Sequence, residues 1–363
     1  MQWKERTLRC AMFINGLGTA LPPTRFTQAE CWQVLESWDR VKQLTRRSQA
    51  LLKKVLLGDS GIATRHFAID SVEEAHALTP DAMHARFARH APRLAAEAGR
   101  RALDSARLRV EEIDAVIVST CTGYLCPGLT SYVSERLALR NNVLALDLVG
   151  QGCGAALPNL RTGDALLASE RCCHVLSICV EVCSAAVYLD DDPGVLISAC
   201  LFSDGAGAAV LSCEPAAHRR RVHWKLAGSL LDPNHRDLLR FEQRAGMLRN
   251  ILTPAVPSLA AEHAETVFRN VASGAGVKRK EIANWIFHAG GRDVLVALRR
   301  RFDLSDAALN WSASVLREVG NISSPFVYHV LERALNHPAT GGWWWLSSFG
   351  AGFSCHGALL EVD

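Results

Sequence analysis

The sequence has no long apolar run. No stretch reaches the about 18 consecutive apolar residues that a membrane-spanning helix requires. The first apolar segment, residues 12–21, is interrupted by asparagine, glycine and threonine, which predicts a first strand and turn instead of a signal peptide. We therefore expect no membrane span.

A strong excess of charge of either sign is also absent. The chain has 40 lysine and arginine residues against 37 aspartate and glutamate residues, a formal net charge of +3. Its basic residues are scattered or form short clusters, such as residues 219–221 and 299–301. Because a nucleic-acid binder shows an extended basic patch, we expect no nucleic-acid partner. With 49% hydrophobic residues, the 363-residue chain is long enough for one large or two medium domains.

Cysteine is frequent, with 12 residues, but the paired CxxC spacing of structural zinc sites is missing. One cluster brings together five residues of metal-binding type: Cys172, Cys173, His174, Cys179 and Cys183. Its spacing does not fit a zinc site, so we expect buried thiols and no metal. Cysteines within apolar runs favour a reducing compartment, which predicts a cytoplasmic location.

Strand-like apolar runs alternate with helical patterns along the whole chain. We expect strands at residues 114–120, 144–149, 174–179, 207–212, 285–287, 343–346 and 354–362, and helices at 93–105, 129–139, 155–169, 259–275, 294–302 and 324–336. This alternation is typical of a layered α/β protein with buried strands. A polar, basic segment at residues 214–224 separates the two parts of the pattern. We therefore predict two related α/β halves, residues 1–215 and 216–363.

Cys153 is the strongest candidate for a reactive group. It follows an apolar run and lies between Gly152 and Gly154, immediately before a helical stretch. A thiol at the N-terminus of a helix faces unpaired backbone N–H groups, which favour the thiolate. This pattern predicts a nucleophile, and a merely buried thiol is the alternative.

Two further segments place polar side chains at the ends of predicted elements. His288 ends a short strand and precedes Gly290 and Gly291, and Asn321 lies in a Gly-Asn turn before a helix. Functional groups of open α/β sheets gather at the carboxyl ends of strands, so Cys153, His288 and Asn321 can converge on one site. Taken alone, His288 can equally be a satisfied polar residue and Asn321 a turn residue.

The chain resembles the type III polyketide synthases, the chalcone-synthase-like branch of the thiolase superfamily. The segment around Cys153 is similar to the family's nucleophile motif. The stretch at 288–291 resembles its His-Pro-Gly-Gly motif, and the stretch at 320–324 resembles its Gly-Asn-Met-Ser-Ser motif. Weaker matches follow in order over residues 10–362, at 59–62, 121–123, 126–128, 201–205 and 349–352. The order and spacing of these motifs are more specific than any single one.

The resemblance implies a thiolase-like α-β-α-β-α fold and a decarboxylative condensing activity without a cofactor. Cys153 would carry the acyl group, because a thiolate exchanges acyl groups with thioesters at little cost. His288 and Asn321 would stabilise the enolate that forms when a malonyl thioester loses carbon dioxide. The backbone of Cys153 and of a loop formed by Phe349, Gly350, Ala351 and Gly352 would supply oxyanion donors.

The same resemblance assigns pocket residues. Phe202 matches an aromatic gatekeeper, and the expected lining consists of Cys121, Thr122, Cys126, Tyr188 and Ser323. Cys126 takes the place of a methionine that reaches into the partner's cavity in the family, which implies a homodimer.

Some positions depart from the family pattern. Ala289 replaces the proline after the histidine, and Ala351 replaces the proline of the family's Gly-Phe-Gly-Pro-Gly motif. The basic residues that hold coenzyme A in plant members do not match position for position. We expect four nearby basic residues to take their place: Arg46, Arg47, Lys53 and Lys54. Since basic charge suits either anionic carrier, coenzyme A and acyl carrier protein both stay open.

Three functions are compatible with these residues. The first is iterative condensation of malonyl-CoA onto an acyl-CoA starter on Cys153, followed by cyclisation to an aromatic or pyrone product. The second is a single condensation of the ketoacyl-ACP synthase III type. The third is a non-catalytic subunit that shapes the cavity of another synthase, which the presence of Cys153, His288 and Asn321 disfavours.

Overall fold

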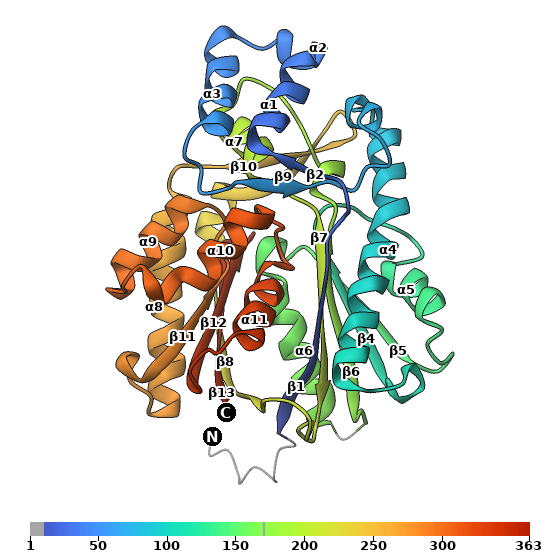
Figure 1. Cartoon of the computed structure of the whole chain (residues 1–363), viewed down its shortest axis with the longest axis vertical. Helices are drawn as coiled ribbons and strands as arrows, with labels where there is room; N and C mark the ends of the chain where they lie inside the picture. The colour runs from blue at the N-terminus through green and yellow to red at the C-terminus, as the bar shows by residue number, and fades with distance from the viewer. Residues whose placement is uncertain (1–10, 170) are drawn as a thin grey trace.

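A computed structural model of the chain describes residues 11–169 and 171–363. Nine strands follow one another in the order β11-β12-β13-β8-β1-β7-β6-β4-β5 (Figure 1). Strands β1 and β8 are joined by only two residue pairs, Met12 with Trp224 and Phe13 with His223. The nine-stranded sheet therefore divides into two halves between these strands. The strands are β1 (Met12–Ala20), β4 (Ala115–Thr120), β5 (Leu144–Val149), β6 (His174–Glu181), β7 (Gly205–Ser212), β8 (Val222–Leu231), β11 (Ile282–Phe287), β12 (Gly342–Gly350) and β13 (Ser354–Val362).

Helices cover the outer faces of both sheet halves and fill the space between them (Figure 1). One outer layer holds α4 (Pro80–Ala106) and α5 (Leu129–Leu137), and the other holds α8 (Val256–Ala275) and α9 (Arg292–Phe302). The central layer is formed by α6 (Ala156–Ala168) and α11 (Phe326–Asn336), which contact strands of both halves. These layers confirm the predicted α-β-α-β-α architecture.

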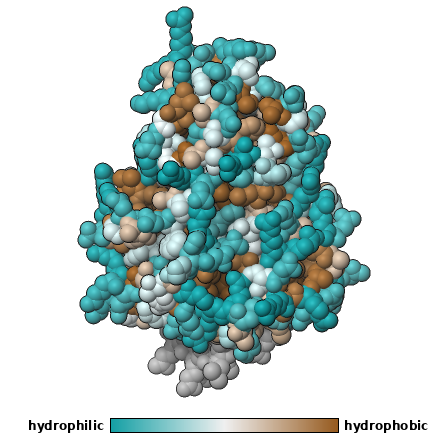
Figure 2. Space-filling view, in the orientation of Figure 1, coloured by the Kyte–Doolittle hydropathy of each residue, from teal (hydrophilic) through white to brown (hydrophobic). Residues whose placement is uncertain are grey.

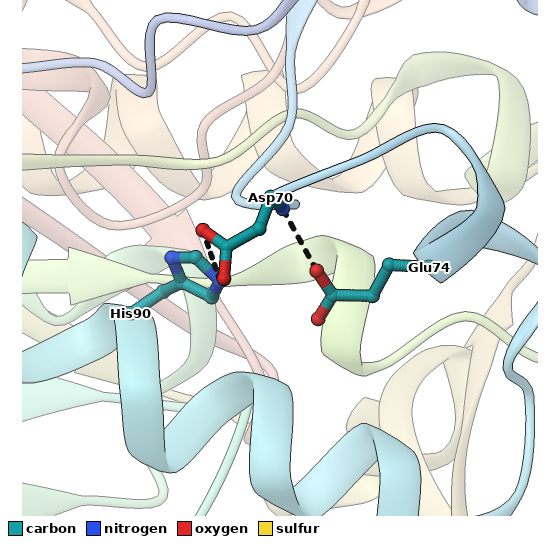
Figure 3. A group of neighbouring side chains, drawn as sticks. All are labelled: Asp70, Glu74 and His90. Atoms are coloured by element: carbon teal, nitrogen blue, oxygen red, sulfur yellow. Dashed lines mark hydrogen bonds and ion pairs between the residues drawn. The ribbon is translucent and has the colours of Figure 1, made fainter.

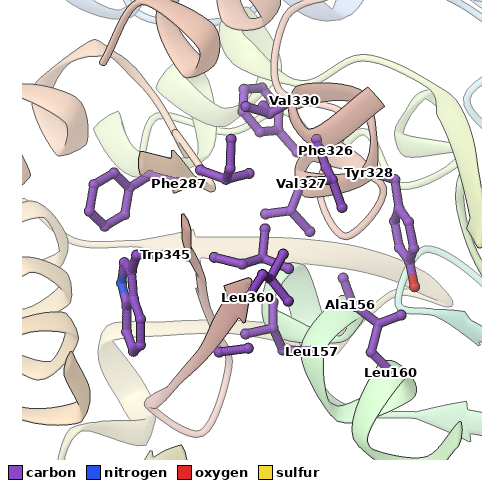
Figure 4. Packing of buried hydrophobic residues seen from close by; sticks show 14 of the residues in the cluster. Ala156, Leu157, Leu160, Phe287, Phe326, Val327, Tyr328, Val330, Trp345 and Leu360 are labelled. Carbon is purple, nitrogen blue, oxygen red and sulfur yellow. The ribbon is translucent and has the colours of Figure 1, made fainter. Parts of the chain in front are cut away.

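The central helices bury apolar residues against both halves of the sheet. Figure 4 shows Leu157 and Leu160 of α6 near Phe326 and Val327 of α11, with Trp345 of β12 alongside. All five side chains are buried. Two successive tryptophans of β12, Trp344 and Trp345, are fully buried in the core.

Glycines on β1 allow the helix α4 to approach the sheet closely. A Cβ atom at Gly16 would lie 2.2 Å from the carbonyl oxygen of Ala102, and one at Gly18 would lie 2.3 Å from that of Ala98. Alanines on the facing side of α4 keep the helix side of this contact equally small.

A smaller layer of elements lies above the sheets at the top of Figure 1. It has its own apolar core, which includes Leu35, Trp38, Leu52 and Leu196. Hydrophilic side chains cover most of the face shown in Figure 2, with hydrophobic groups in separate patches. The sequence pattern did not predict this cap, whose elements are α1 (Gln28–Ser37), α2 (Asp39–Lys42), α3 (Arg46–Leu57), α7 (Pro193–Leu201), β2 (Arg25–Thr27), β3 (Thr64–His66), β9 (Leu239–Arg244) and β10 (Met247–Leu252).

The structure shifts several predicted element bounds, and two of these shifts are the largest. The helix expected at 93–105 begins at Pro80 and continues through Pro92, and the strand expected at 343–346 extends to Gly350. The division at residue 215 lies in the connection between β7 and β8 and stays a prediction. Among the described residues, no helix is long and apolar enough to cross a membrane.

Candidate active site

A cavity with about 770 Å³ of free space, part of it open to solvent, lies between the cap and the carboxyl end of β4. Seven of the residues predicted for the site line it: Cys121, Thr122, Cys153, Tyr188, Phe202, Ser323 and Ala351. Cys183 adds a third thiol to this wall. The cavity therefore brings the proposed nucleophile and the proposed gatekeeper to one surface.

Cys153 sits in a single 3-10 turn, η3 (Gly152–Gly154), between β5 and α6. Gly152 has φ of +56°, a left-handed conformation that favours glycine, and a Cβ atom there would lie 2.9 Å from the backbone nitrogen of Ala351. A Cβ atom at Gly350 would lie 2.5 Å from the backbone nitrogen of Gly154. The flanking glycines thus let the end of β12 pack directly on the turn that carries the thiol.

The thiol of Cys153 accepts a hydrogen bond of 3.1 Å from the hydroxyl of Ser323. The sulfur of Cys121 lies 3.6 Å from the same hydroxyl. Burial raises the pKa of Cys153 to about 12, although the bond from Ser323 acts in the opposite direction. Burial thus opposes formation of a thiolate while the hydrogen bond from Ser323 favours it, and a resting thiolate stays a prediction.

His288 follows β11 and is buried between two aromatic rings. Its ring centroid lies 5.1 Å from that of Phe349 and 5.4 Å from that of Phe326. Neither ring nitrogen has a hydrogen-bond partner among the described residues, and burial lowers the pKa of His288 to about 3. Burial therefore favours the neutral form of the His288 imidazole.

Asn321 ties the motifs of the site together. Its amide nitrogen donates to the carbonyl oxygen of Gly290 at 2.8 Å, and its amide oxygen accepts from the backbone nitrogen of Ser323 at 2.9 Å. Ser323 has φ of +57°, an uncommon conformation for a non-glycine residue that points to a site with fixed geometry. The side chain of Asn321 therefore links the loop after His288 to the serine that contacts Cys153.

His288 and Asn321 are not among the residues that line the cavity in this structure. Their exposed fractions are 1% and 3%. Because an amide nitrogen carries two hydrogens, the bond to Gly290 leaves Asn321 a further N–H donor. The arrangement offers a thiol on the cavity wall together with a buried, unpartnered imidazole and a buried amide donor.

The residues matched by two family models cover almost the whole chain. Residues 20–232 match the model described as FAE1/Type III polyketide synthase-like protein, and residues 233–362 match the C-terminal domain of chalcone and stilbene synthases. The chain belongs to the type III polyketide synthase family. It is a condensing enzyme of the acyltransferase type.

Curated relatives agree with this assignment. The synthase is 32% identical to a 1,3,6,8-tetrahydroxynaphthalene synthase from Streptomyces peucetius subsp. caesius, over 96% of this chain and 92% of the relative. It is 30% identical to a phloroglucinol synthase from Pseudomonas fluorescens, over 83% of this chain and 89% of the relative.

Solved structures show the same fold. PKS-I from the brown alga Ectocarpus siliculosus superposes with a TM-score of 0.89 at 24% identity, covering 99% of this chain and 100% of that chain. The fungal type III polyketide synthase ORAS superposes with a TM-score of 0.84 at 23% identity, covering 97% and 100%.

A buried arginine of the synthase holds the backbone of Phe202, the residue predicted to be a gatekeeper. Phe202 caps the end of α7, and its carbonyl oxygen accepts from Arg65 at 3.1 Å. Arg65 also donates to Ala199 at 2.7 Å and lines the cavity. The backbone of Phe202 also forms a parallel β-bridge with the backbone of Asn321. This bridge holds the two residues beside each other.

Other residues that were predicted for the site do not line the cavity. Phe349 and Gly350 end β12 instead of lying in a loop, and with Gly352 they are not part of the lining. Cys126 is exposed and does not reach the cavity of its own chain. The four basic carrier-binding candidates are all exposed on α3: Arg46, Arg47, Lys53 and Lys54.

The sequence pattern missed Glu181, a fully buried carboxyl group at the end of β6. It accepts from the hydroxyls of Thr122 at 2.8 Å and Ser324 at 2.5 Å, and from the backbone nitrogen of Cys121 at 3.0 Å. Burial raises the pKa of Glu181, and these bonds oppose the rise. An acidic residue inside an otherwise apolar run was the available signal, since charged side chains are rarely buried without partners.

Proposed function

We propose that this synthase condenses malonyl-CoA repeatedly onto an acyl group held on Cys153 and cyclises the product to an aromatic or pyrone polyketide. The observation that carries the proposal is the thiol of Cys153 on the cavity wall, linked through Ser323 and Asn321 to the loop that follows His288. Membership of the family gives this arrangement its chemistry.

We propose that the thiol of Cys153 and the imidazole of His288 are both neutral before acyl transfer begins, because burial favours these forms. As the sulfur of Cys153 attacks the starter carbonyl, its proton moves to the unpartnered imidazole of His288. The imidazolium then returns the proton to the departing coenzyme A sulfur. Cys153 and His288 are charged only while bonds form and break. The buried site therefore avoids the unfavourable free energy of keeping a thiolate permanently.

During extension of the acyl chain, Asn321 and His288 act as hydrogen-bond donors to the group derived from malonyl-CoA. Malonyl-CoA loses carbon dioxide, and the electrons of the broken bond form an enolate whose oxygen accepts hydrogen bonds from Asn321 and His288. The enolate carbon attacks the thioester carbonyl on Cys153, which releases the Cys153 sulfur for the next acyl group. These steps use thioester substrates only, and we propose that no cofactor takes part.

The basic side chains exposed on α3 support the proposal that the substrate is attached to an anionic carrier. Arg46, Arg47, Lys53 and Lys54 lie on this helix, which belongs to the cap above the cavity (Figure 1). We propose coenzyme A as that carrier, with acyl carrier protein as the alternative. A cytoplasmic location stays a prediction.

We further propose a homodimer that forms through β5. This strand is at one edge of the sheet, pairs with β4 on one side, and exposes 43% of Leu144 and 56% of Val149. Tyr124, which is 70% exposed, and the exposed Cys126 follow β4 at the same edge. Apolar groups on an unpaired edge strand favour a second copy.

Products from a panel of acyl-CoA starters with malonyl-CoA test the iterative activity. We expect mass spectra with two or more added two-carbon units and with the loss of water or of coenzyme A that accompanies cyclisation. One added unit with every starter would instead support a single-condensation enzyme. A protein that is inert alone but alters the products of a second synthase would support the non-catalytic alternative.

Asn321→Ala tests the enolate step separately. We expect conversion of malonyl-CoA to acetyl-CoA to slow by about a hundredfold or more, because one preorganised donor is lost. Asn284→Ala is the matched control, since Asn284 is a buried asparagine on β11 that contacts Thr340 and Trp311 instead of the site. Decarboxylation at the wild-type rate in Asn321→Ala would remove Asn321 from this role.

A further inference from the structure

Three side chains outside the cavity converge where the segment after β3 meets α4. Asp70 precedes the 3-10 turn η1 (Glu73–His76), Glu74 lies within it, and His90 projects from α4. Figure 3 shows the three side chains pointing toward one another. One potential ligand atom from each residue lies within 4.8 Å of the other two.

His90 is the unexplained member of this group. Its side chain is 9% exposed, and its Nε2 atom has no hydrogen-bond partner among the described residues. The atom lies 3.9 Å from a carboxylate oxygen of Asp70, which is too far for a hydrogen bond. A buried ring nitrogen without a partner is unfavourable, so a further group that bonds to it would stabilise the site.

We propose that Asp70, Glu74 and His90 bind a divalent metal ion. One imidazole nitrogen and two carboxylate oxygens form a mixed donor set that suits a first-row ion such as Mn²⁺ or Zn²⁺, with water in the open positions. Burial lowers the pKa of His90, which is consistent with the neutral imidazole that a ligand must be. The family's condensation chemistry makes no use of these residues.

The neighbouring arginines determine how the ion would enter. Arg89 lies 2.7 Å from one oxygen of Asp70 and 3.9 Å from Glu74, and its side chain is 52% exposed. It can therefore move into solvent when a cation takes its place between the carboxylates. Arg86 is buried, with its Nε atom 3.6 Å from Glu74, and keeps its position because it donates to Ser184 at 2.6 Å.

This contact connects the metal site to the catalytic cavity. Ser184 lines the cavity, and its backbone and hydroxyl both donate to the buried carboxylate of Asp204. An ion bound to Glu74 would fix the position of η1. Because Arg86 contacts Glu74 and also donates to Ser184, the ion would in turn stabilise the part of the cavity wall that contains Ser184. We assign the ion a structural role that is separate from catalysis.

Binding of Mn²⁺ to the purified full-length chain tests the site, with loss of the free-ion signal in electron paramagnetic resonance as the readout. Mn²⁺ is chosen because carboxylates suit it better than the chain's thiols do. We expect one site in the wild type and affinity lowered about tenfold or more in Asp70→Asn and His90→Gln. The Asp70 side chain is 54% exposed, so its substitution carries little folding risk.

Two arginine variants test the competition. Arg89→Gln frees the Asp70 carboxylate and is expected to bind Mn²⁺ more tightly than Arg93→Gln, which removes the same charge from an exposed position on α4. Absence of wild-type binding at about 1 mM Mn²⁺ would overturn the proposal, as would equal binding by wild type, Asp70→Asn and His90→Gln. These readouts are independent of polyketide formation.

Discussion

At the scale of single residues, burial shifts the pKa values of the Cys153 thiol and the His288 imidazole in the directions that favour their neutral forms. Burial raises the pKa of Cys153 to about 12 and lowers that of His288 to about 3. These shifts support our proposal that the proton stays on sulfur until a substrate binds. A thiol that stays protonated is protected from oxidation, which acts on the thiolate.

Alkylation of Cys153 as a function of pH tests this neutral state. With iodoacetamide, we expect the rate of modification to rise about tenfold per pH unit from pH 6 to 10 without a plateau, because the thiolate fraction limits the reaction. Peptide mass spectrometry distinguishes alkylation of Cys153 from alkylation of the other cysteines. Alkylation of the exposed Cys126 serves as the control for the activity of the reagent. A plateau beginning below pH 7 would show a thiolate–imidazolium pair and contradict the neutral state.

The three principal residues of the site could be predicted because each lies in a local pattern with its own meaning. Glycines flank Cys153, precede Asn321 and follow His288, and such turns at element ends place side chains in a site. Glu181 and Arg65 could not be predicted in the same way. Their surroundings come from segments more than 55 positions away, such as Cys121 and Ser324 for Glu181 and Phe202 for Arg65.

At the scale of elements, β5 differs from the other strands of its half because it is solvent-facing in the single chain. Its exposed residues alternate with partly buried ones, and it is paired along one edge only. A partner copy that continues the sheet would satisfy the free edge and cover Leu144 and Val149.

Ala145→Lys in β5 tests this interface. A lysine at this exposed position would place a charge at the proposed interface, and we expect the dimer to dissociate at least tenfold more readily in sedimentation velocity. Ala283→Lys is the matched control, because Ala283 is exposed on β11 at the opposite edge of the sheet. Equal dimer stability in both variants would place the interface elsewhere.

Element bounds were less predictable than element type, and α4 shows why. Proline lacks a backbone N–H and usually ends a helix, so the pattern predicted a start after Pro92. In the structure Pro92 is buried within α4, and Phe87 and Ala91, which precede it, belong to the same apolar cluster as Ala95 and Ala98, which follow it. Tertiary packing outweighed the local cost.

At the scale of the whole molecule, two sheet halves enclose a central helical layer, which buries several titratable groups. His329 of α11 is one of them: its Nε2 atom lies 2.9 Å from the carbonyl oxygen of Ala206. Burial, with a smaller contribution from Arg333, lowers the pKa of His329 to about 4. Its neutral form is therefore part of the folded state.

The pH dependence of unfolding tests that burial. A depressed histidine pKa gives stability that is present above the unfolded value of 6.5 and is lost as pH falls toward the folded value of about 4. Relative to His329→Gln, wild type should lose roughly 3 kcal/mol of unfolding free energy between pH 7 and 4 in urea titrations. Parallel pH profiles of the two proteins would show that His329 is not held neutral.

The central claim is that Cys153 alone carries the growing chain, although Cys121 and Cys183 line the same cavity. The most direct measurement is peptide mass spectrometry of the enzyme quenched during turnover with an acyl-CoA starter and malonyl-CoA. We predict starter and extended acyl masses on the Cys153 peptide in wild type, Cys121→Ser and Cys183→Ser, and no acyl mass on any peptide of Cys153→Ser. Acyl groups on Cys121 or Cys183 with Cys153 unmodified, or product formation by Cys153→Ser, would contradict the account.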